Sequence, residues 1–392
     1  MVLDKIKMIY LQSKKSANRI LNTLSSHIAT ITIALLTIFA GYGAQAQETA
    51  GTPGTDTLTI RFFGDIMMHS QQITSAATKD GVFRFDRYFT HIGKYLNDSD
   101  LNVANMEFTL AGEPYTGYPT FSAPDQYARH IADCGFNIFL AANNHICDKR
   151  SAGMARTLQI YRDLAASKGI YFTGLAGNTD ESARTTPLII EVKGIKIALV
   201  NATYGTNLGY DHHWPKTNYL NNRKMLEGAL KTAEDQADIT IFLPHWGEEY
   251  KLRHNNTQRE MAQWMADNGA DAVIGSHPHV IQDYEILTSG DRQIPVVYSL
   301  GNAISNMSAE NTQVGLMVTM KITRSSNGKT DILPLEFTYL WSSRPGGYCN
   351  SYTILPLTEF LDRPEDWTGS WEHNKMATAY QRVAESTGIK EN

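Results

Sequence analysis

From residue 57 onward, short runs of apolar residues alternate with segments whose apolar residues recur at helical spacing. Apolar runs of about four to eight residues are typical of strands, and a period of about 3.6 residues is typical of helices. The predicted strands are 57–63, 101–104, 137–142, 171–172, 188–192, 195–201, 239–243, 270–274 and 296–300. The predicted helices are 154–167, 221–236 and 257–268. This alternation indicates an α/β protein.

Two predicted hairpins indicate that the sheets also contain antiparallel pairs. Lys193-Gly194 separates the predicted strands 188–192 and 195–201, which is the spacing of a tight hairpin. A second hairpin is predicted from strands 315–324 and 331–337 near the end of the pattern. We therefore expect mixed rather than purely parallel sheets.

The pattern also divides the chain into segments. Residues 47–56 are polar and rich in Gly, Pro and Thr, and they read as a linker. The alternating strands and helices predict one domain over 57–337. Residues 338–392, with a predicted helix near 373–386, are assigned to a C-terminal extension packed on that domain.

The first 46 residues have the features of a secretory signal peptide. Their basic residues are Lys5, Lys7, Lys14, Lys15 and Arg19. The apolar run Ile28–Ala40 is shorter than the roughly 20 residues that a membrane span needs. Ala44-Gln45-Ala46 then supplies small residues of the kind that a signal peptidase recognises. The sequence thus predicts an exported protein, periplasmic or associated with the cell surface; an uncleaved N-terminal anchor is the alternative.

Net charge narrows the class of partner. The chain carries a net charge of −5, and removal of residues 1–46 leaves 30 basic and 39 acidic residues, a net −9. No basic field would then attract a polyanion from a distance, which argues against nucleic acid or anionic lipid as the partner. After residue 46 no apolar run has the character of a membrane span, so the mature chain is expected to have none.

The chain has three cysteines, Cys134, Cys147 and Cys349. A small, odd number of cysteines does not indicate a disulfide framework. One bridge is compatible with an oxidising compartment, and the sequence does not select its partners. The sequence does not predict an oligomeric state.

Residues able to bind a metal ion follow the predicted strands closely. Ligands of open α/β sheets bind beyond the carboxyl ends of strands, so side chains in these positions can converge. The six candidate metal ligands are Asp65, Glu107, Asn144, His245, His277 and His279. Each is weak evidence alone, but their shared placement predicts a metal site.

His277 and His279 are the strongest pair, since they flank Pro278 directly after a predicted buried strand. A residue before proline favours an extended backbone, and imidazole suits Zn, Fe, Mn or Ni. The plainer interpretation is two histidines on a turn. His245, at the end of another strand, has a plainer interpretation too, as a hydrogen-bonded core histidine.

The remaining candidates supply oxygen ligands and a proton donor. Asp65 and Glu107 are the anionic candidates, and a carboxylate at Glu107 can bridge two cations. Asn144 offers a neutral amide oxygen, while His145 beside it can act as a general acid. The alternatives are a turn at Asn143-Asn144-His145 and a helix N-cap at Asp65.

Six short blocks of this sequence resemble the signature blocks of the CapA family, the poly-γ-glutamate capsule-synthesis family within the calcineurin-like metallophosphatase superfamily. They are Gly64-Asp65, Asn105-Met106-Glu107, Ala142-Asn143-Asn144-His145, His245-Trp246-Gly247-Glu248-Glu249-Tyr250, Gly275-Ser276-His277-Pro278-His279-Val280-Ile281-Gln282 and Tyr298-Ser299-Leu300-Gly301-Asn302. The blocks occur in family order between residues 57 and 305. The resemblance implies a four-layer α/β/β/α sandwich with mixed sheets and a site at its strand ends.

The resemblance also implies roles for individual residues. Asp65 resembles the aspartate of the first metal, and Glu107 stands where the superfamily has a bridging aspartate. Asn144, His245 and His277 resemble the ligands of the second metal, and His279 resembles the last ligand of the first. His145 resembles the histidine that protonates a leaving group.

Two positions depart from the superfamily pattern or lie outside the ligand set. The first superfamily block is Asp-x-His, and its third position here is Met67, a poor ligand for hard cations. His69 lies two residues on and is a candidate substrate contact. Tyr204 and Asn207, in a segment that resembles the family, are also candidate substrate contacts, with ordinary loop structure as the alternative.

Two hypotheses of function follow. The first is a metal-dependent hydrolase, holding one or two divalent ions of Mn, Fe or Zn, that acts in synthesis or processing of a capsular or cell-surface polymer. The second is a non-catalytic, metal-dependent binder or assembly factor for an anionic surface polymer or its precursor. A closed structural metal site fits less well, because such sites are usually rich in Cys.

Overall fold

The computed structural model describes residues 57–209 and 213–391. The predicted signal peptide (1–46) and linker (47–56) lie outside the described residues. Two mixed β-sheets form the centre of the described part of the chain, together with a two-stranded pair of β5 (Leu175–Ala176) and β8 (Lys216–Thr217).

The larger sheet has nine strands among the described residues, and β1 lies inside it. Its main order is β17 (Thr353–Pro356), β16 (Glu336–Ser343), β14 (Val314–Arg324), β1 (Thr57–Ile66), β2 (Leu101–Met106), β3 (Ile138–Leu140) and β4 (Tyr171–Thr173). β13 (Asn302–Ile304) pairs with β1, and β15 (Thr330–Ile332) pairs with β14. β1, β2, β3 and β4 run parallel, whereas β14, β16 and β17 are antiparallel.

The smaller sheet has six strands among the described residues. Its order is β11 (Tyr284–Ser289), β12 (Arg292–Val297), β10 (Ala272–Ile274), β9 (Ile239–His245), β7 (Ile195–Thr203) and β6 (Leu188–Val192). The four inner strands are parallel, and an antiparallel strand closes each edge. The predicted hairpin of β6 and β7 and the predicted mixed sheets are therefore confirmed.

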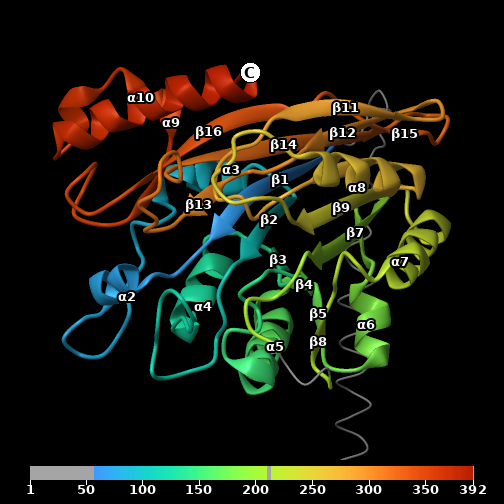
Figure 1. Ribbon diagram of the computed structural model, residues 1–392, viewed down its shortest axis with the longest axis horizontal. Helices are drawn as coiled ribbons and strands as arrows, with labels where there is room; N and C mark the ends of the chain where they lie inside the picture. Colours follow the sequence, from blue (N-terminus) through green and yellow to red (C-terminus); the bar gives the residue numbers. More distant parts are fainter. Residues whose placement is uncertain (1–56, 210–212, 392) are drawn as a thin grey trace, which may run out of the picture. The chain divides into compact units, whose positions relative to one another are not determined.

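Three apolar clusters show how the layers are stacked. One cluster joins the two sheets, with Ile60 of β1 and Ile241 of β9 among its fully buried members. A second lies between the larger sheet and the helices α4 (Asp125–Asp133) and α5 (Arg150–Lys168). A third lies between the smaller sheet and the helices α7 (Arg223–Gln236) and α8 (Asn256–Asp267). The order helix, sheet, sheet, helix is the four-layer sandwich that the sequence predicted (Figure 1).

Local sequence signals set the ends of these helices. Asn255 caps α8 in a capping box with Gln258, which satisfies backbone N–H groups that the helix leaves unpaired. Gly169 ends α5 in the left-handed conformation at φ 71°, where a residue without a Cβ is favoured. The shorter helical segments are α2 (Ser70–Ala76), η1 (Thr90–Ile92), α3 (Gly93–Asn97), α6 (Thr179–Thr185), α9 (Leu357–Leu361) and η2 (Pro364–Asp366).

The C-terminal helix α10 (Ser370–Thr387) lies alongside β16 (Figure 1). Its buried residues Met376, Ala379 and Val383 belong to the apolar cluster between the sheets. The boundary expected at residue 337 falls within β16, so residues 338–343 continue a strand of the larger sheet.

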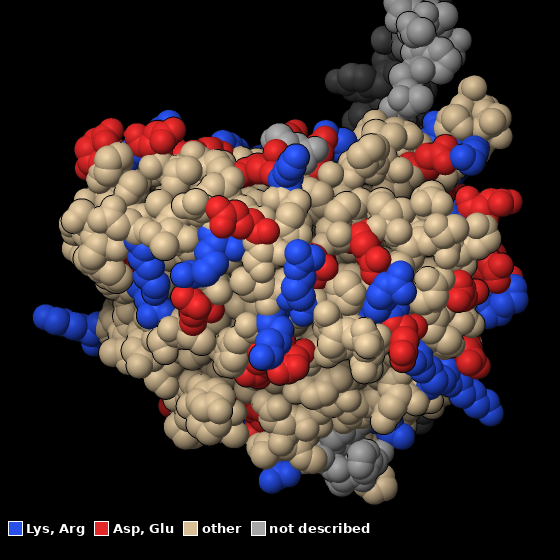
Figure 2. Space-filling model, turned by 45° about the horizontal axis from the view of Figure 1, so that its top comes forward, with Lys and Arg blue, Asp and Glu red and all other residues tan. Residues whose placement is uncertain are grey.

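The described surface carries both signs of charge. Figure 2 shows basic and acidic side chains interspersed over the face in view. Among the helices of the described residues, none has both the length and the apolar character needed to span a bilayer.

Candidate metal centre

The predicted ligands come together at the carboxyl ends of strands from both sheets. Figure 1 shows the arrowheads of β1, β2, β7 and β9 pointing toward the same central region. All six side chains are at most 3% exposed, so they form a buried polar group inside an otherwise apolar fold. They are Asp65 in β1, Glu107 after β2, Asn144 after β3, His245 at the end of β9, and His277 and His279 after β10.

Close backbone contacts fix the two sheets at this point. Asp65 N–H donates to the carbonyl of Gly301 at 2.9 Å, and Asp65 pairs in parallel register with Asn302 of β13. A Cβ at Gly64 would lie 1.9 Å from the oxygen of Gly301, so only glycine permits this approach. The smaller sheet is tied similarly, through a parallel bridge between His245 and Ser276.

The two carboxylates share one hydrogen-bond donor. Asn105 Nδ2 donates to Asp65 Oδ1 at 2.8 Å and to Glu107 Oε2 at 3.3 Å. Burial raises the pKa of Glu107 well above its usual range, and the charge of Asp65 raises it further. Two buried carboxyl groups that share one donor favour a cation between them.

Three buried atoms test whether the residues fit a metal ion. Asp65 Oδ2, Glu107 Oε1 and His277 Nδ1 have no hydrogen-bond partner among the described residues. A buried polar atom without a partner is costly, and a cation would satisfy two carboxylate oxygens and an imidazole nitrogen together. The donor set of oxygen and nitrogen atoms suits Mn, Fe or Zn.

Glu107 belongs to both groups of side chains that are close enough to hold an ion. One group is Glu107, His277 and His279, the other is Asp65, Glu107 and His245, and the ligand atoms of each lie within 4.8 Å of one another. The groups mix the ligands that the resemblance assigns to separate ions.

His245 and His277 are held as neutral imidazoles. Burial lowers the pKa of each well below its usual range, and neighbouring histidines lower it further. His245 Nδ1 lies 3.0 Å from Ser276 Oγ, which leaves its Nε2 directed at Asn144 Oδ1, 2.8 Å away. A neutral imidazole is the form that binds metal.

His279 is held by a carboxylate and an amide. Its Nδ1 lies 3.0 Å from Asn302 Oδ1 and 3.3 Å from Asp65 Oδ2, and its Nε2 lies 3.7 Å from Glu107 Oε1. Burial lowers its pKa, but the negative charge of Asp65 beside the ring outweighs burial and leaves the pKa above its usual value.

The backbone of the His-Pro-His segment differs from the expectation. His277 has φ 104° and His279 has φ 59°, so the extended conformation predicted for the residue before Pro278 is wrong. Positive φ is rare and costly for residues with a Cβ, and strain of this kind gathers at functional sites. The sharp turn keeps the two imidazole rings 5.9 Å apart at the same centre.

His145 stands beside the ligands with a partner of its own. Its Nδ1 lies 2.7 Å from Asp148 Oδ2, an arrangement in which Nδ1–H donates to the carboxylate. Its Nε2 lies 3.3 Å from Asn207 Nδ2, and Asn207 N–H donates to the carbonyl of Asn144 at 2.8 Å. The structure therefore brings His145, Asn144 and Asn207 together.

The other substrate candidates lie farther out. Tyr204 is 47% exposed and its ring lies 4.6 Å from that of His277, so it reaches the mouth of the site. His69 packs edge-on against Phe121, and the Phe121 ring also packs edge-on against His145. Burial, above all, lowers the pKa of His69 to about 4, so the ring is neutral near pH 7.

Met67 is 2% exposed and belongs to the apolar cluster beneath the larger sheet. Its backbone carbonyl accepts a hydrogen bond from Gln72 Nε2 at 3.2 Å. The third position of the first superfamily block is thus part of the core here.

Sequence reasoning missed three partners of the predicted ligands: Asn105, Asp148 and Asn302. Asn105 precedes Glu107 by two residues at the end of a strand, a spacing that puts both side chains on one face. Asp148 follows His145 by three residues, within reach of its ring on a turn. For Asn302 the signal was its position after a predicted strand.

A sandwich whose strand ends gather carboxylate, amide and imidazole groups around unpartnered buried atoms is an α/β fold with a candidate site for a divalent metal ion. Comparison with known families makes this assignment more specific. The chain belongs to the family of bacterial capsule synthesis proteins PGA_cap, whose model matches residues 59–307. The resemblance to the CapA family is thereby confirmed.

Relatives from two bacilli are similar over most of this chain. The capsule biosynthesis protein CapA of Bacillus anthracis is 25% identical over 346 residues, covering 85% of this chain and 80% of that protein. The PGA biosynthesis protein CapA of Bacillus subtilis is 25% identical over 348 residues, covering 85% and 84%. Among solved structures, a putative 5′-nucleotidase from Staphylococcus aureus matches with a TM-score of 0.46 and 10% identity, covering 72% of this chain and 54% of that one.

Proposed function

We propose that this protein is a metal-dependent hydrolase that acts in synthesis or processing of a capsular or cell-surface polymer. The observation that carries the proposal is the pair of buried oxygens without partners, Asp65 Oδ2 and Glu107 Oε1, beside neutral imidazoles. Membership in the capsule synthesis family supports the polymer as the class of substrate.

In this proposal six side chains hold one or two divalent ions of Mn, Fe or Zn. The ligands would be Asp65, Glu107, Asn144, His245, His277 and His279. When bound, such an ion acidifies a water molecule and polarises the scissile phosphoryl or carbonyl group.

The residues around the ligands have separate tasks. His145 gives a proton to the leaving group from Nε2, while Asp148 holds the opposite ring nitrogen and so fixes the orientation of the imidazole. Asn207 Nδ2 lies 3.3 Å from His145 Nε2, and in this proposal it orients the ring or the leaving group. Tyr204 and His69 are the proposed substrate contacts. Tyr204 lies beside His277, and His69 is separated from His145 by the ring of Phe121.

The position of Met67 favours a second candidate, a metal-dependent binder or assembly factor for an anionic polymer. With this side chain in the core, the first ion has one ligand fewer than the superfamily pattern provides. A binder needs no proton donor, so the two candidates differ in what they require of His145.

Metal content is the direct test of the site. The purified protein is expected to bind divalent metal stoichiometrically. His277→Ala is expected to lose the metal, because the substitution removes a neutral imidazole whose Nδ1 has no other partner. His91→Ala, at a ring that packs against Phe360, is the matched control. Elemental analysis of the three proteins decides the matter, and stoichiometric metal in His277→Ala would refute the ligand assignment.

The proposal places the protein outside the cytoplasm, in the periplasm or at the cell surface. Its support is the signal-like composition of residues 1–46, together with membership in a capsule synthesis family. We expect the mature chain to begin at Gln47. Intact-mass spectrometry of the protein from its natural cell tests this, and a mass that includes residues 1–46 would show an uncleaved anchor.

A further inference from the structure

Arg344, in the loop between β16 and β17, differs in its surroundings from the other arginines of the described residues. Each of the others is either exposed or paired with a carboxylate. Arg344 is partly buried, and its guanidinium forms no ion pair with a described carboxylate. A charge withdrawn from water is costly unless an opposite charge or hydrogen bonds compensate it. These surroundings indicate an anion that the chain itself does not supply.

The guanidinium of Arg344 also has donors to spare. Its Nη2 donates to the carbonyl of Met307, which uses one of five protons. The Nε proton has no acceptor, but it is sealed from solvent and out of reach of a ligand. Nη1 makes no hydrogen bond within the described part of the chain, so its two protons are the donors left for a ligand.

Glu372 lies near Arg344 but does not pair with its guanidinium. This carboxylate is fully buried, and its Oε1 accepts from the backbone N–H of Arg344 at 3.2 Å and from Gln313 Nε2 at 3.0 Å. Its Oε2 accepts from Ser343 Oγ at 2.5 Å. All of these donors are neutral, so the charge of Glu372 balances one cation of this region.

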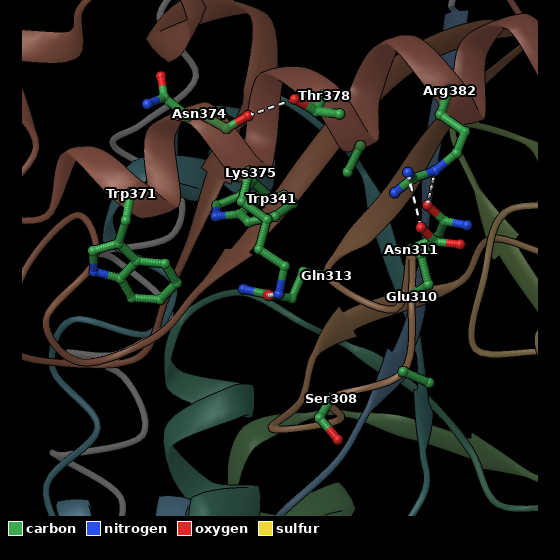
Figure 3. A pocket seen from close by; sticks show the side chains of 12 residues that line it. Ser308, Glu310, Asn311, Gln313, Trp341, Trp371, Asn374, Lys375, Thr378 and Arg382 are labelled. Atoms are coloured by element: carbon green, nitrogen blue, oxygen red, sulfur yellow. Dashed lines mark hydrogen bonds and ion pairs between the residues drawn. The ribbon is translucent and has the colours of Figure 1, made fainter.

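The neighbouring charges leave one positive charge in excess. Lys375 lies beside Gln313 and donates to its Oε1 (Figure 3). Arg382, farther along α10, is neutralised by Glu310 at 2.8 Å (Figure 3). Arg344 and Lys375 together thus face the single negative charge of Glu372, and the guanidinium keeps no counter-charge in contact with it.

Arg344 lines a hollow of about 570 Å³ between α2, the loop after β13 and the loop after β16. Among the residues that line it, only Arg344 is charged. Ser70, Gln71, Thr74 and Ser75 contribute the exposed face of α2, where residues one helical turn apart lie side by side. The lining therefore combines one cation with neutral polar side chains and has no carboxylate to compete with a ligand.

Neutral donors from two further segments complete the lining. Asn306 Oδ1 accepts from Tyr352 OH at 2.8 Å, which fixes the amide and leaves Nδ2 to donate. Gln71 and Ser75 are exposed, and their side chains form no hydrogen bond with other residues that the structure describes. Together with Arg344, these groups bring donors to the hollow from three separate segments of the chain.

The hollow lies beside the metal centre without including its ligands. Asn306 N–H donates to His69 Nδ1 at 3.3 Å, and Ser70 follows His69 directly. None of the six candidate metal ligands is among the lining residues. A ligand in the hollow is therefore a neighbour of His69 and makes no use of a metal ion.

We propose that this hollow binds the phosphoryl group of a small phosphorylated molecule, with Arg344 as the counter-charge. A planar guanidinium is well suited to phosphoryl oxygens. A phosphoryl group offers three terminal oxygens to donors from three segments, whereas a carboxylate offers two in one plane. The volume falls within the range of small-molecule pockets, about 300–1,000 Å³, so the rest of the molecule fits as well. The site requires neither metal nor hydrolysis and thus goes beyond the proposed function.

Calorimetric titration of the full-length protein tests the proposal. Metal is first removed by dialysis, because a bound ion would itself take up phosphate. The probes are glucose 6-phosphate, glucuronate, which carries a carboxylate in place of the phosphorylated carbon, and inorganic phosphate. We expect glucose 6-phosphate to bind about tenfold more tightly than either of the others, since one charged hydrogen bond or the contacts of a sugar ring contribute on that scale.

Each probe also has a result that counts against the proposal. Equal binding of glucuronate would refute the phosphoryl group, and equal binding of inorganic phosphate would refute the larger molecule. Absence of binding by both probes that carry phosphorus would refute the site itself.

Two variants locate the binding. Arg344→Gln removes the counter-charge and is expected to weaken binding of glucose 6-phosphate at least about tenfold. Arg184→Gln, at an exposed arginine of α6, is its matched control. Ser75→Asp changes no buried contact but adds a negative charge to the hollow, and a loss of about tenfold is expected from repulsion. Ser167→Asp is the control, since both serines are exposed and next to last in their helices.

His277→Ala separates this site from the metal centre. It is expected to bind glucose 6-phosphate normally, whether or not the proposed hydrolase function holds. Full binding in both Arg344→Gln and Ser75→Asp, or loss of binding in His277→Ala, would overturn the proposal.

Discussion

His145 is the residue whose chemistry separates a hydrolase from a binder. It is 3% exposed, its Nδ1 is held by Asp148 at 2.7 Å, and its Nε2, which lies 3.3 Å from Asn207 Nδ2, is the nitrogen proposed to serve a leaving group. General acids contribute about 10²–10⁴-fold to rate. His145→Ala is therefore expected to lower kcat by a factor in this range while bound metal stays stoichiometric.

Asp148→Asn tests the same hydrogen bond from its other side. The amide keeps the size of the carboxylate but removes the negative charge that holds Nδ1–H and orients the ring, so kcat should fall about tenfold or more. Turnover of phosphoester and γ-glutamyl probes, with metal content measured beside it, checks both variants. Full turnover in His145→Ala would favour the binder and refute the proton donor.

At the scale of elements, the packing of β1 against the segment before β13 is the contact that holds the site. A Cβ on Gly64 would meet the backbone oxygen of Gly301 at 1.9 Å, and backbone cannot yield as a flexible side chain does. Gly64→Ala is expected to cost about 3 kcal/mol of unfolding free energy and to weaken metal binding through Asp65.

Gly228, in the interior of α7, supplies the matched control. A Cβ there meets nothing within 4 Å, and alanine is the better helix former. Gly228→Ala is thus expected to raise the unfolding free energy by about 0.5–1 kcal/mol. Urea denaturation measures both variants; if Gly64→Ala is as stable as Gly228→Ala, the close packing does not govern this part of the fold.

The elements that the sequence predicted are those with strong apolar patterns. β7 and β9, for example, are buried along almost their whole length, so their apolar runs stand out. The edge strand β11 was missed because only Leu287 of its six residues is buried, and its pairing with β12 stabilises it instead. The nine-residue α4 was missed too, since it buries only Tyr127, Ala128 and Ile131.

The candidate site was also predictable only where a local feature of the sequence marked it. Side chains placed at strand ends were predictable, because chain direction alone brings them to one edge. The positions of Asn105 and Asn302 carried the same signal, but their partners did not, because Asp65 and His279 are distant from them in the sequence. The positive φ of His277 also depends on tertiary packing, and the local preference of a residue before proline predicts the opposite.

At the scale of the whole molecule, the C-terminal segment completes the larger sheet. Val314 of β14 pairs with Trp341 of β16, and Leu355 of β17 continues the sheet beyond it. The fully buried side chains of Trp341, Leu355 and Met376 belong to the cluster between the two sheets. Residues 338–391 therefore contribute strands and buried side chains to the core.

A chain that ends at residue 337 is expected not to fold. It would lose several buried apolar side chains worth about 1.5–3 kcal/mol each, against a net stability of about 5–15 kcal/mol for a whole domain. It would also leave β14 without β16 as its neighbour, which exposes an unpaired strand edge. Residues 57–392, with the same start and an intact end, are the control and should give one cooperative urea transition by circular dichroism. A similar transition for residues 57–337 would show instead that residues 338–392 are an appendage to an independent domain.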